Sequence, residues 1–319
     1  MGTKTTILST EEMENILYDC VIGQTTPCYL DLSEVRDHNG RSLLHWTANL
    51  GLKEETEYLL TYINPNVTDD EGQTPLHITS DPEIALILIR HGADPNLRDG
   101  KGRTSLHYAR SAELAELLIR HGANPNIADN EGNTPLHTSD AIEVILRHGA
   151  DPNLRNKKGL PPIFYTENCK DMMLLLHATD RDIVANTRNE HGETLLHLAA
   201  RYNCVEAAQI LVEFIDINSR DADGNTALHL ACIYKNFEMI KWLLSAGADL
   251  KIPNKNGLIP FKMIVGMCRN DIPCAEILEM VLEMADVETV DIKMAFNTEQ
   301  IKLLQLLLRR NLLQKILQT

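Results

Sequence analysis

A four-residue phrase recurs along the chain at nearly constant spacing, and this periodicity limits the possible folds more than any other feature. It places a serine or threonine three residues before a histidine, at His45, His77, His107, His137, His197 and His229. Glycines at positions 40, 72, 102, 132, 159, 192, 224 and 257 open the blocks, with spacings of 32, 30, 30, 27, 33, 32 and 33 residues. Such a period indicates repeated units that bury their apolar sides only by stacking.

Each unit reads as two helices and a turn. Thr74 stands where a first helix begins and can accept from its free N–H groups, and Pro75 suits the first helical position. Leucines such as Leu114 and Leu118 give the second helix an apolar side. Gly92 and its equivalents stand where the second helix ends, a place that favours a left-handed backbone.

The phrase Thr-Pro-Leu-His77 and the later phrase Ile-Arg-His-Gly-Ala-Asp-Pro-Asn96 resemble the ankyrin repeat family over about residues 37–285. The resemblance implies an all-α ankyrin-repeat solenoid of about eight helix-turn-helix units, with hairpin tips and helical caps. It also implies a structural role for the motif histidines. Two units depart from the motif: Phe164 replaces the histidine in the fifth, and the eighth, from Gly257, looks like the start of a terminal cap.

The ends predict caps on either side of the array, which would give residues 1–36, 37–285 and 286–319 as domains. Ser9 and Glu12 form a capping-box pattern that predicts a helix from about 10 to 22. Gln300 to Leu317 has leucines at helical spacing, and residues 292–319 are basic. This last segment is interpreted as a C-terminal cap, with a separate docking helix as the alternative.

Charge and cysteine usage exclude several classes of protein. The net charge of −15 lacks the basic footprint of a nucleic-acid binder. Apolar runs such as Ile84 to Ile89 are about a third of what spans a bilayer, so no integral membrane segment is expected. The seven cysteines are scattered without a CxxC pair, which argues against a disulfide framework and for a reducing, cytoplasmic location.

No catalytic, metal or cofactor site is predicted, so the chain is expected not to be an enzyme. Nine of the twelve histidines fall at repeat positions, either in the motif or before a helix-ending glycine. No P-loop, dinucleotide fingerprint or nucleophile elbow occurs. Cys268 and Cys274 have no matching ligands and are interpreted as incidental thiols.

In the family, hairpin tips and first helices line a groove that binds another protein. At the tips the sequence predicts a basic stripe that attracts an acidic segment of the partner. The alternative is that these are ordinary solvent-exposed charges. The stripe consists of Arg98, Lys101, Arg155, Lys157, Arg188 and Arg220. Trp46 and Tyr108 directly follow the motif histidine, and Tyr202 and Tyr234 stand five residues after it. These rings are candidate anchors, with packing between units as the alternative.

Units two, three and four are short, and the missing residues are assigned to the end of the first helix and the following loop, around Ser80, Ser111 and Asp140. Losing three residues removes nearly one helical turn. Arg110 and Asp140 beside the gap are therefore added to the candidate partner site. A notch or tightened bend that docks the partner is one interpretation, and neutral drift is its rival.

These features predict a non-enzymatic scaffold or adaptor that binds another, unidentified protein and is a monomer by itself. The alternative is a host-targeted effector of an intracellular bacterium or virus, which captures a host protein in the cytosol or nucleus. Fold alone does not decide between these two functions.

Overall fold

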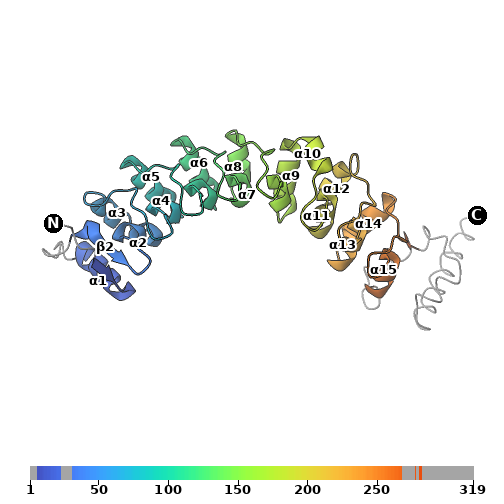
Figure 1. The fold of residues 1–319 in the computed structure, drawn as a ribbon, viewed down its shortest axis with the longest axis horizontal. Coiled ribbons are helices and arrows are strands. Elements are labelled where there is room, and N and C mark those ends of the chain that lie inside the picture. Colours follow the sequence, from blue (N-terminus) through green and yellow to red (C-terminus); the bar gives the residue numbers. More distant parts are fainter. Residues whose placement is uncertain (1–5, 23–30, 268–276, 278–279, 282–319) are drawn as a thin grey trace, which may run out of the picture. The chain divides into compact units, whose positions relative to one another are not determined.

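The computed structural model describes residues 6–22, 31–267, 277, 280 and 281 (Figure 1). The chain divides into two compact units, Met1–Tyr165 and Thr166–Thr319. The boundary follows Phe164, the residue that replaces a motif histidine. The predicted C-terminal cap at 286–319 and the thiols Cys268 and Cys274 lie outside the described residues.

Unit one begins with a helix and a small sheet. Helix α1 (Thr10–Ile22) starts where the capping box predicts: the N–H of Ser9 donates to Glu12 Oε2 at 2.8 Å, and the N–H of Glu12 donates to Ser9 Oγ at 3.3 Å. Strand β1 (Thr6–Leu8) pairs in parallel with β2 (Val35–Asp37), and the short 3₁₀ helix η1 (Leu32–Glu34) leads into β2. The sequence did not predict this sheet, so the N-terminal region is not purely helical.

The rest of unit one alternates first and second helices. The first helices are α2 (Leu43–Leu50), α4 (Pro75–Ile78), η2 (Ser105–Tyr108), α7 (Pro135–Thr138) and η3 (Pro162–Tyr165). The second helices are α3 (Lys53–Leu59), α5 (Pro82–Arg90), α6 (Ala112–Arg120) and α8 (Ile142–Arg147). Neighbouring pairs stand side by side (Figure 1). Leucines such as Leu106 and Leu118 are fully buried.

Unit two contains α9 (Cys169–Ala178), α10 (Arg181–Asn186), α11 (Leu195–Arg201), α12 (Val205–Leu211), α13 (Ala227–Ile233), α14 (Phe237–Ser245) and α15 (Pro260–Met267). Helix α10 has no counterpart in the other described repeats. Repeats two, three, four and seven end the second helix with a glycine at positive φ, whereas α9 ends at Thr179 in extended backbone. The chain then enters a further helical turn instead of a tight loop.

The motif histidines fasten each repeat to the next. In all six, Nδ1 accepts from the N–H of the motif serine or threonine at 3.0–3.2 Å. The proton must therefore be on Nε2, which donates to a hairpin carbonyl of the following repeat at 2.9–3.1 Å. This bond supports the structural role that the family resemblance implied.

Hairpins and turns supply two more links between repeats. The hairpin of one repeat bonds the next through the backbone, as where the N–H of Gly100 donates to the carbonyl of Glu71 at 2.7 Å. Gly72 lies so close to this contact, at φ +76°, that a Cβ would be 2.8 Å from Gly100 N. In the turns, Asn96 donates to the carbonyl of Gly122 and accepts from the N–H of Asn124, both at 2.8 Å.

The missing residues do lie in the first helices. Helices α4, η2 and α7 have 4 residues each, against 8 in α2 and 7 in α11 and α13. Two details differ from the prediction. The fifth repeat shares the deletion, because η3 also has 4 residues and α10 restores the total length. The fourth repeat loses three further residues from its second helix, since α8 has 6 residues where α5 and α6 have 9.

Candidate partner-binding surface

The unit-one aromatic candidates are held by their own hairpins. Trp46 and Tyr108 are both half-buried. Trp46 Nε1 donates to Asp37 Oδ2 at 3.1 Å, and the Tyr108 hydroxyl donates to Asp99 Oδ2 at 2.6 Å. Burial and this aspartate raise the pKa of Tyr108. The polar tip of each ring is thus occupied, and only part of its apolar surface remains for a partner.

The basic stripe is built into the hairpins rather than standing free of them. Arg155 Nη1 donates to the Gly159 carbonyl at 2.8 Å, and Arg188 Nη1 donates to the Gly192 carbonyl at 2.8 Å. Arg220 bonds the carbonyls of Gly224 and Pro253, at 3.2 and 2.7 Å. These guanidinium groups therefore stabilise the hairpins, although the residues remain exposed.

The other charged candidates lie at the surface and form weak pairs. Lys101 is 3.9 Å from Glu71, with both side chains two-thirds exposed, and Arg98 and Lys157 are exposed hairpin residues. Arg110 and Asp140 follow the shortened first helices and approach to 3.7 Å, with side chains 86% and 65% exposed. Exposed pairs of this kind contribute at most about 1 kcal/mol, so these ions are available to a partner at little cost.

The unit-two candidates form a more open surface, which we call the tyrosine patch: Arg201, Tyr202, Ile233 and Tyr234. These residues lie at the C-terminal ends of α11 and α13, two first helices that pack against each other. Ile233 and Tyr234 are 51% and 49% exposed, and Tyr202 is half-buried. The guanidinium carbon of Arg201 lies 5.7 Å from the centroid of the Tyr234 ring.

Sequence reasoning missed two members of the tyrosine patch and the anchor beneath it. Arg201 forms an ion pair with Glu193, which is only 3% exposed. Ile233 was not predicted because it is neither an aromatic residue nor a hairpin cation. The one signal in the sequence is that Asn203 and Lys235 stand where the first repeat has Gly51. Both adopt a positive φ, +57° and +56°, which non-glycine residues rarely do.

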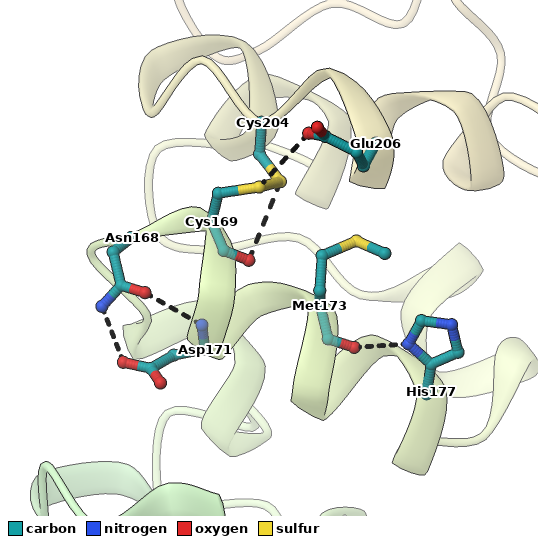
Figure 2. Close-up of a disulfide and its surroundings, with 7 residues drawn as sticks. All are labelled: Asn168, Cys169, Asp171, Met173, His177, Cys204 and Glu206. Atoms are coloured by element: carbon teal, nitrogen blue, oxygen red, sulfur yellow. Dashed lines mark hydrogen bonds between the residues drawn. A yellow bond between two sulfur atoms is a disulfide. The ribbon is translucent and has the colours of Figure 1, made fainter.

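A disulfide joins Cys169 and Cys204, although the scattered cysteines argued against a disulfide framework and for a reducing location (Figure 2). Cys169 opens α9, whose first turn is capped by Asn168 Oδ1 accepting from the Asp171 N–H at 2.9 Å. Cys204 directly precedes α12. Stacking of α9 on α12 brings together two residues 35 positions apart, which spacing alone does not indicate.

The same two cysteines and Glu206 are the one grouping of possible metal ligands within the described residues. Figure 2 shows the Glu206 carboxylate directed toward the sulfurs. Sulfur binds metal as a thiolate, and a disulfide provides none. In the oxidised state this cluster therefore has no ligand set for an ion. Cys232 is a free, buried thiol, and burial raises its pKa.

A family model for ankyrin repeats, covering three copies at a time, matches residues 22–99, 79–156, 138–221 and 163–254. The chain therefore belongs to the ankyrin repeat family. A comparison with curated proteins gave no match. Ankyrin repeats are generally protein–protein interaction modules and are typically non-enzymatic. None of the described helices is long and apolar enough to cross a membrane.

Proposed function

We propose that this chain is a non-enzymatic scaffold or adaptor that binds another protein through its first helices and hairpins. One observation carries the proposal: Ile233 and Tyr234 present about half of their surface to solvent at the end of α13. Tyrosine and arginine dominate binding energies at interfaces, and Arg201 lies against the Tyr234 ring.

The tyrosine patch has the composition of an interface centre. Arg201 is fixed beneath by the buried Glu193 carboxylate, so its guanidinium loses little freedom when a partner covers Tyr234. The tyrosine ring has few rotatable bonds and an apolar body, which lowers the entropy cost of ordering it. A partner segment that supplies an apolar side chain to Ile233 and an acceptor to the Tyr234 hydroxyl would complement this patch.

A second contact region is proposed on unit one. The shortened first helices of repeats two to five leave Arg110 and Asp140 exposed at consecutive repeats. Tyr108 presents part of its ring on the same helix layer. The notch interpretation belongs here: a partner element would occupy the space vacated by about one helical turn in each repeat.

Affinity capture from eukaryotic cell lysate, followed by mass spectrometry and by affinity measurement on the captured protein, tests the proposal. The variant Ile233→Ala/Tyr234→Ala should lose at least tenfold in affinity. Tyr62→Ala is the matched control, because Tyr62 is 53% exposed but follows a second helix, α3. Equal affinity in all three proteins would refute binding through the tyrosine patch.

A unit-one variant locates the second region. Tyr108→Ala combined with Arg98→Glu and Arg155→Glu removes one ring and reverses two charges. Loss of affinity in this variant alone would place the partner on unit one rather than on the tyrosine patch. Circular dichroism of every variant at equal concentration separates loss of binding from loss of fold.

The alternative function is that of a host-targeted effector that captures and blocks or relocates a host protein. Irregular repeats support it: four shortened first helices, the short α8 and the inserted α10 depart from a regular array. We further propose a monomer of about eight repeats between an N-terminal cap (1–36) and a C-terminal cap or docking helix (286–319). The cytoplasmic location is proposed together with a reduced Cys169–Cys204 pair, because the cytosol keeps thiols reduced. Specific capture of a host protein, with no partner in the source organism, would favour the effector function.

A further inference from the structure

Two cysteines and a glutamate meet where the second helix of the fifth repeat packs against that of the sixth. Cys169 is the first residue of α9, Cys204 directly precedes α12, and Glu206 lies in the first turn of α12. Both sulfurs and a Glu206 carboxylate oxygen lie within 4.8 Å of one another (Figure 2). Cys204 is buried, Cys169 is half-buried and Glu206 is exposed, so the group opens to solvent on the glutamate side.

The corresponding contact between the first and second repeats contains a cation. Lys53, the first residue of α3, forms an ion pair with Glu83, the second residue of α5. Cys169 and Glu206 occupy the same two helix positions in the fifth and sixth repeats. With a cysteine in place of the lysine, Glu206 has no cationic partner within the described part of the chain. A metal ion bound to thiolates would supply the positive charge that is missing at this contact.

The chemistry of the donors selects zinc once the disulfide is reduced. A cellular thiol reduces it by exchange: the S–S bond breaks, two cysteine thiols form, and two molecules of the cellular thiol are oxidised to their own disulfide. Binding of Zn²⁺ then releases the two thiol protons and forms two Zn–S bonds and one Zn–O bond. Thiolates favour zinc over Mg²⁺ and Ca²⁺, which prefer oxygen ligands. Three protein ligands leave the fourth tetrahedral position to water.

The distances agree with such a site. For Zn–S and Zn–O bonds of about 2.3 and 2.0 Å, tetrahedral geometry places a sulfur about 3.5 Å from an oxygen and about 3.8 Å from a second sulfur. Glu206 Oε2 lies 3.5 Å from Cys169 Sγ. The Cα atoms of Cys169 and Cys204 are 5.0 Å apart, so rotation about the Cys204 Cα–Cβ bond can separate the reduced sulfurs while the backbone stays in place.

We propose that the reduced Cys169–Cys204 pair and Glu206 bind one Zn²⁺ ion. The ion joins α9 to α12 in the reduced protein, as the disulfide joins them in the oxidised protein. The same two sulfurs serve both states, so oxidation expels the metal.

Competition with a chromophoric zinc chelator measures Zn²⁺ binding to the full chain, reduced with a phosphine and kept under anaerobic conditions. The reduced wild type should bind one Zn²⁺ with a dissociation constant below about 1 µM. The reduced variant Cys169→Ser/Cys204→Ser retains the other five of the seven cysteines and should bind at least about a hundredfold more weakly. Equal affinity in these two proteins, or no binding by the reduced wild type, would overturn the proposal.

Matched glutamate variants test the third ligand. Glu206→Gln keeps the shape and removes the charge, and should weaken Zn²⁺ binding at least about tenfold. Glu238→Gln is the control, because Glu238 is the second residue of α14 and pairs with Lys241 at 3.5 Å. It should bind as wild type does, and circular dichroism checks that every variant is folded. Unchanged affinity in Glu206→Gln would refute the three-ligand site.

Cobalt gives an independent readout of the ligands. Co²⁺ in place of Zn²⁺ should show thiolate-to-metal charge-transfer absorption in the reduced wild type. That absorption should be lost in Cys169→Ser/Cys204→Ser and after reoxidation of the pair. Absorption that persists in either case would contradict coordination by these two sulfurs. The site shares no residue with the tyrosine patch, so the outcome is separable from that of the proposed function.

Discussion

The motif histidines make the fold sensitive to mild acid, and His45 gives the clearest case. Its imidazole is 1% exposed, and burial lowers its pKa to about 4 from an ordinary value of 6.5. Nδ1 accepts from the Ser42 N–H, so a proton there would oppose an N–H that already points at it. Burial lowers the pKa of the other five motif histidines in the same way.

The direction in which stability changes with pH follows from which state, folded or unfolded, binds the proton more readily. Because the folded-state pKa of His45 is below the unfolded value, the unfolded chain takes up a proton first as the pH falls. Stability is fully present above pH 6.5 and is lost as the pH falls toward 4. One histidine contributes a slope of about 1.4 kcal/mol per pH unit, or about 2 kcal/mol between pH 6.5 and pH 5.

Urea unfolding of wild type and His45→Gln at pH 7.5 and pH 5 measures this contribution. Trp242→Phe in both proteins leaves Trp46 as the only tryptophan, so fluorescence reports on unit one. Glutamine can still donate to the Gln73 carbonyl but cannot titrate. At pH 7.5 the variant should be less stable by about 1–3 kcal/mol, and that difference should shrink by about 2 kcal/mol at pH 5.

His38→Gln is the matched control, because His38 is exposed in unit one. Because the His38 side chain is exposed, this substitution should change the unfolding free energy at pH 7.5 by less than about 0.5 kcal/mol. A difference between wild type and His45→Gln that is equal at both pH values would refute the account of a buried neutral imidazole.

Three further outcomes follow from the links within and between repeats. Reducing the Cys169–Cys204 disulfide should lower the unfolding free energy of unit two by about 4 kcal/mol, from the entropy of a 35-residue loop; calorimetry with and without a phosphine reductant measures it. Gly132→Ala should cost at least about 1 kcal/mol more than Gly92→Ala in urea unfolding. Both have positive φ, but only at Gly132 would a Cβ meet backbone, at 2.9 Å. Asn96→Ala should cost about 1–2 kcal/mol, since its side chain links two turns through two hydrogen bonds; equal melting temperatures would contradict that link.

The parts of the fold that sequence predicts are those fixed by chemistry local to one repeat. Thr74 predicts a helix start because its hydroxyl and the His77 ring satisfy the first turn within four residues. Gly92 predicts a helix end because few other residues adopt its φ of +97°. The Ser9–Glu12 pair is equally local, and α1 begins there.

Features that depend on packing between repeats were not predicted. The Cys169–Cys204 pair is brought together only when α9 stacks on α12, and β1 pairs with β2 across 26 intervening residues. The deletion in the fifth repeat was hidden because α10 restores the spacing between its flanking glycines to 33 residues. The spacing between two motif glycines measures only the total length of a repeat. A deletion and an insertion in different segments of the same repeat therefore cancel and are not seen.

The candidate partner-binding surface was likewise predicted where it depends on position within one repeat, and not where it depends on contacts in the folded structure. The sequence selected Tyr234 and Tyr202 by their position relative to the motif histidine, and both lie at exposed or half-buried helix ends. It also selected Arg155 and Arg188, whose guanidinium groups turn out to bond their own hairpins. Residue type and position in the repeat place an arginine at the surface. They do not show whether its guanidinium group is free or donates to a nearby carbonyl.

The links between repeats explain how the lengths can vary without loss of register. The motif histidine acts at the start of the first helix, and the hairpin bond and turn asparagine act after the second helix has ended. The segments between these points can lose three residues, as in α4 and η2, and every link in repeats two and three remains. Variation is therefore confined to the helix ends and to the inserted α10. Those same segments carry Arg110, Asp140 and Tyr234, so the proposed contact residues can diverge while the stacking chemistry stays constant.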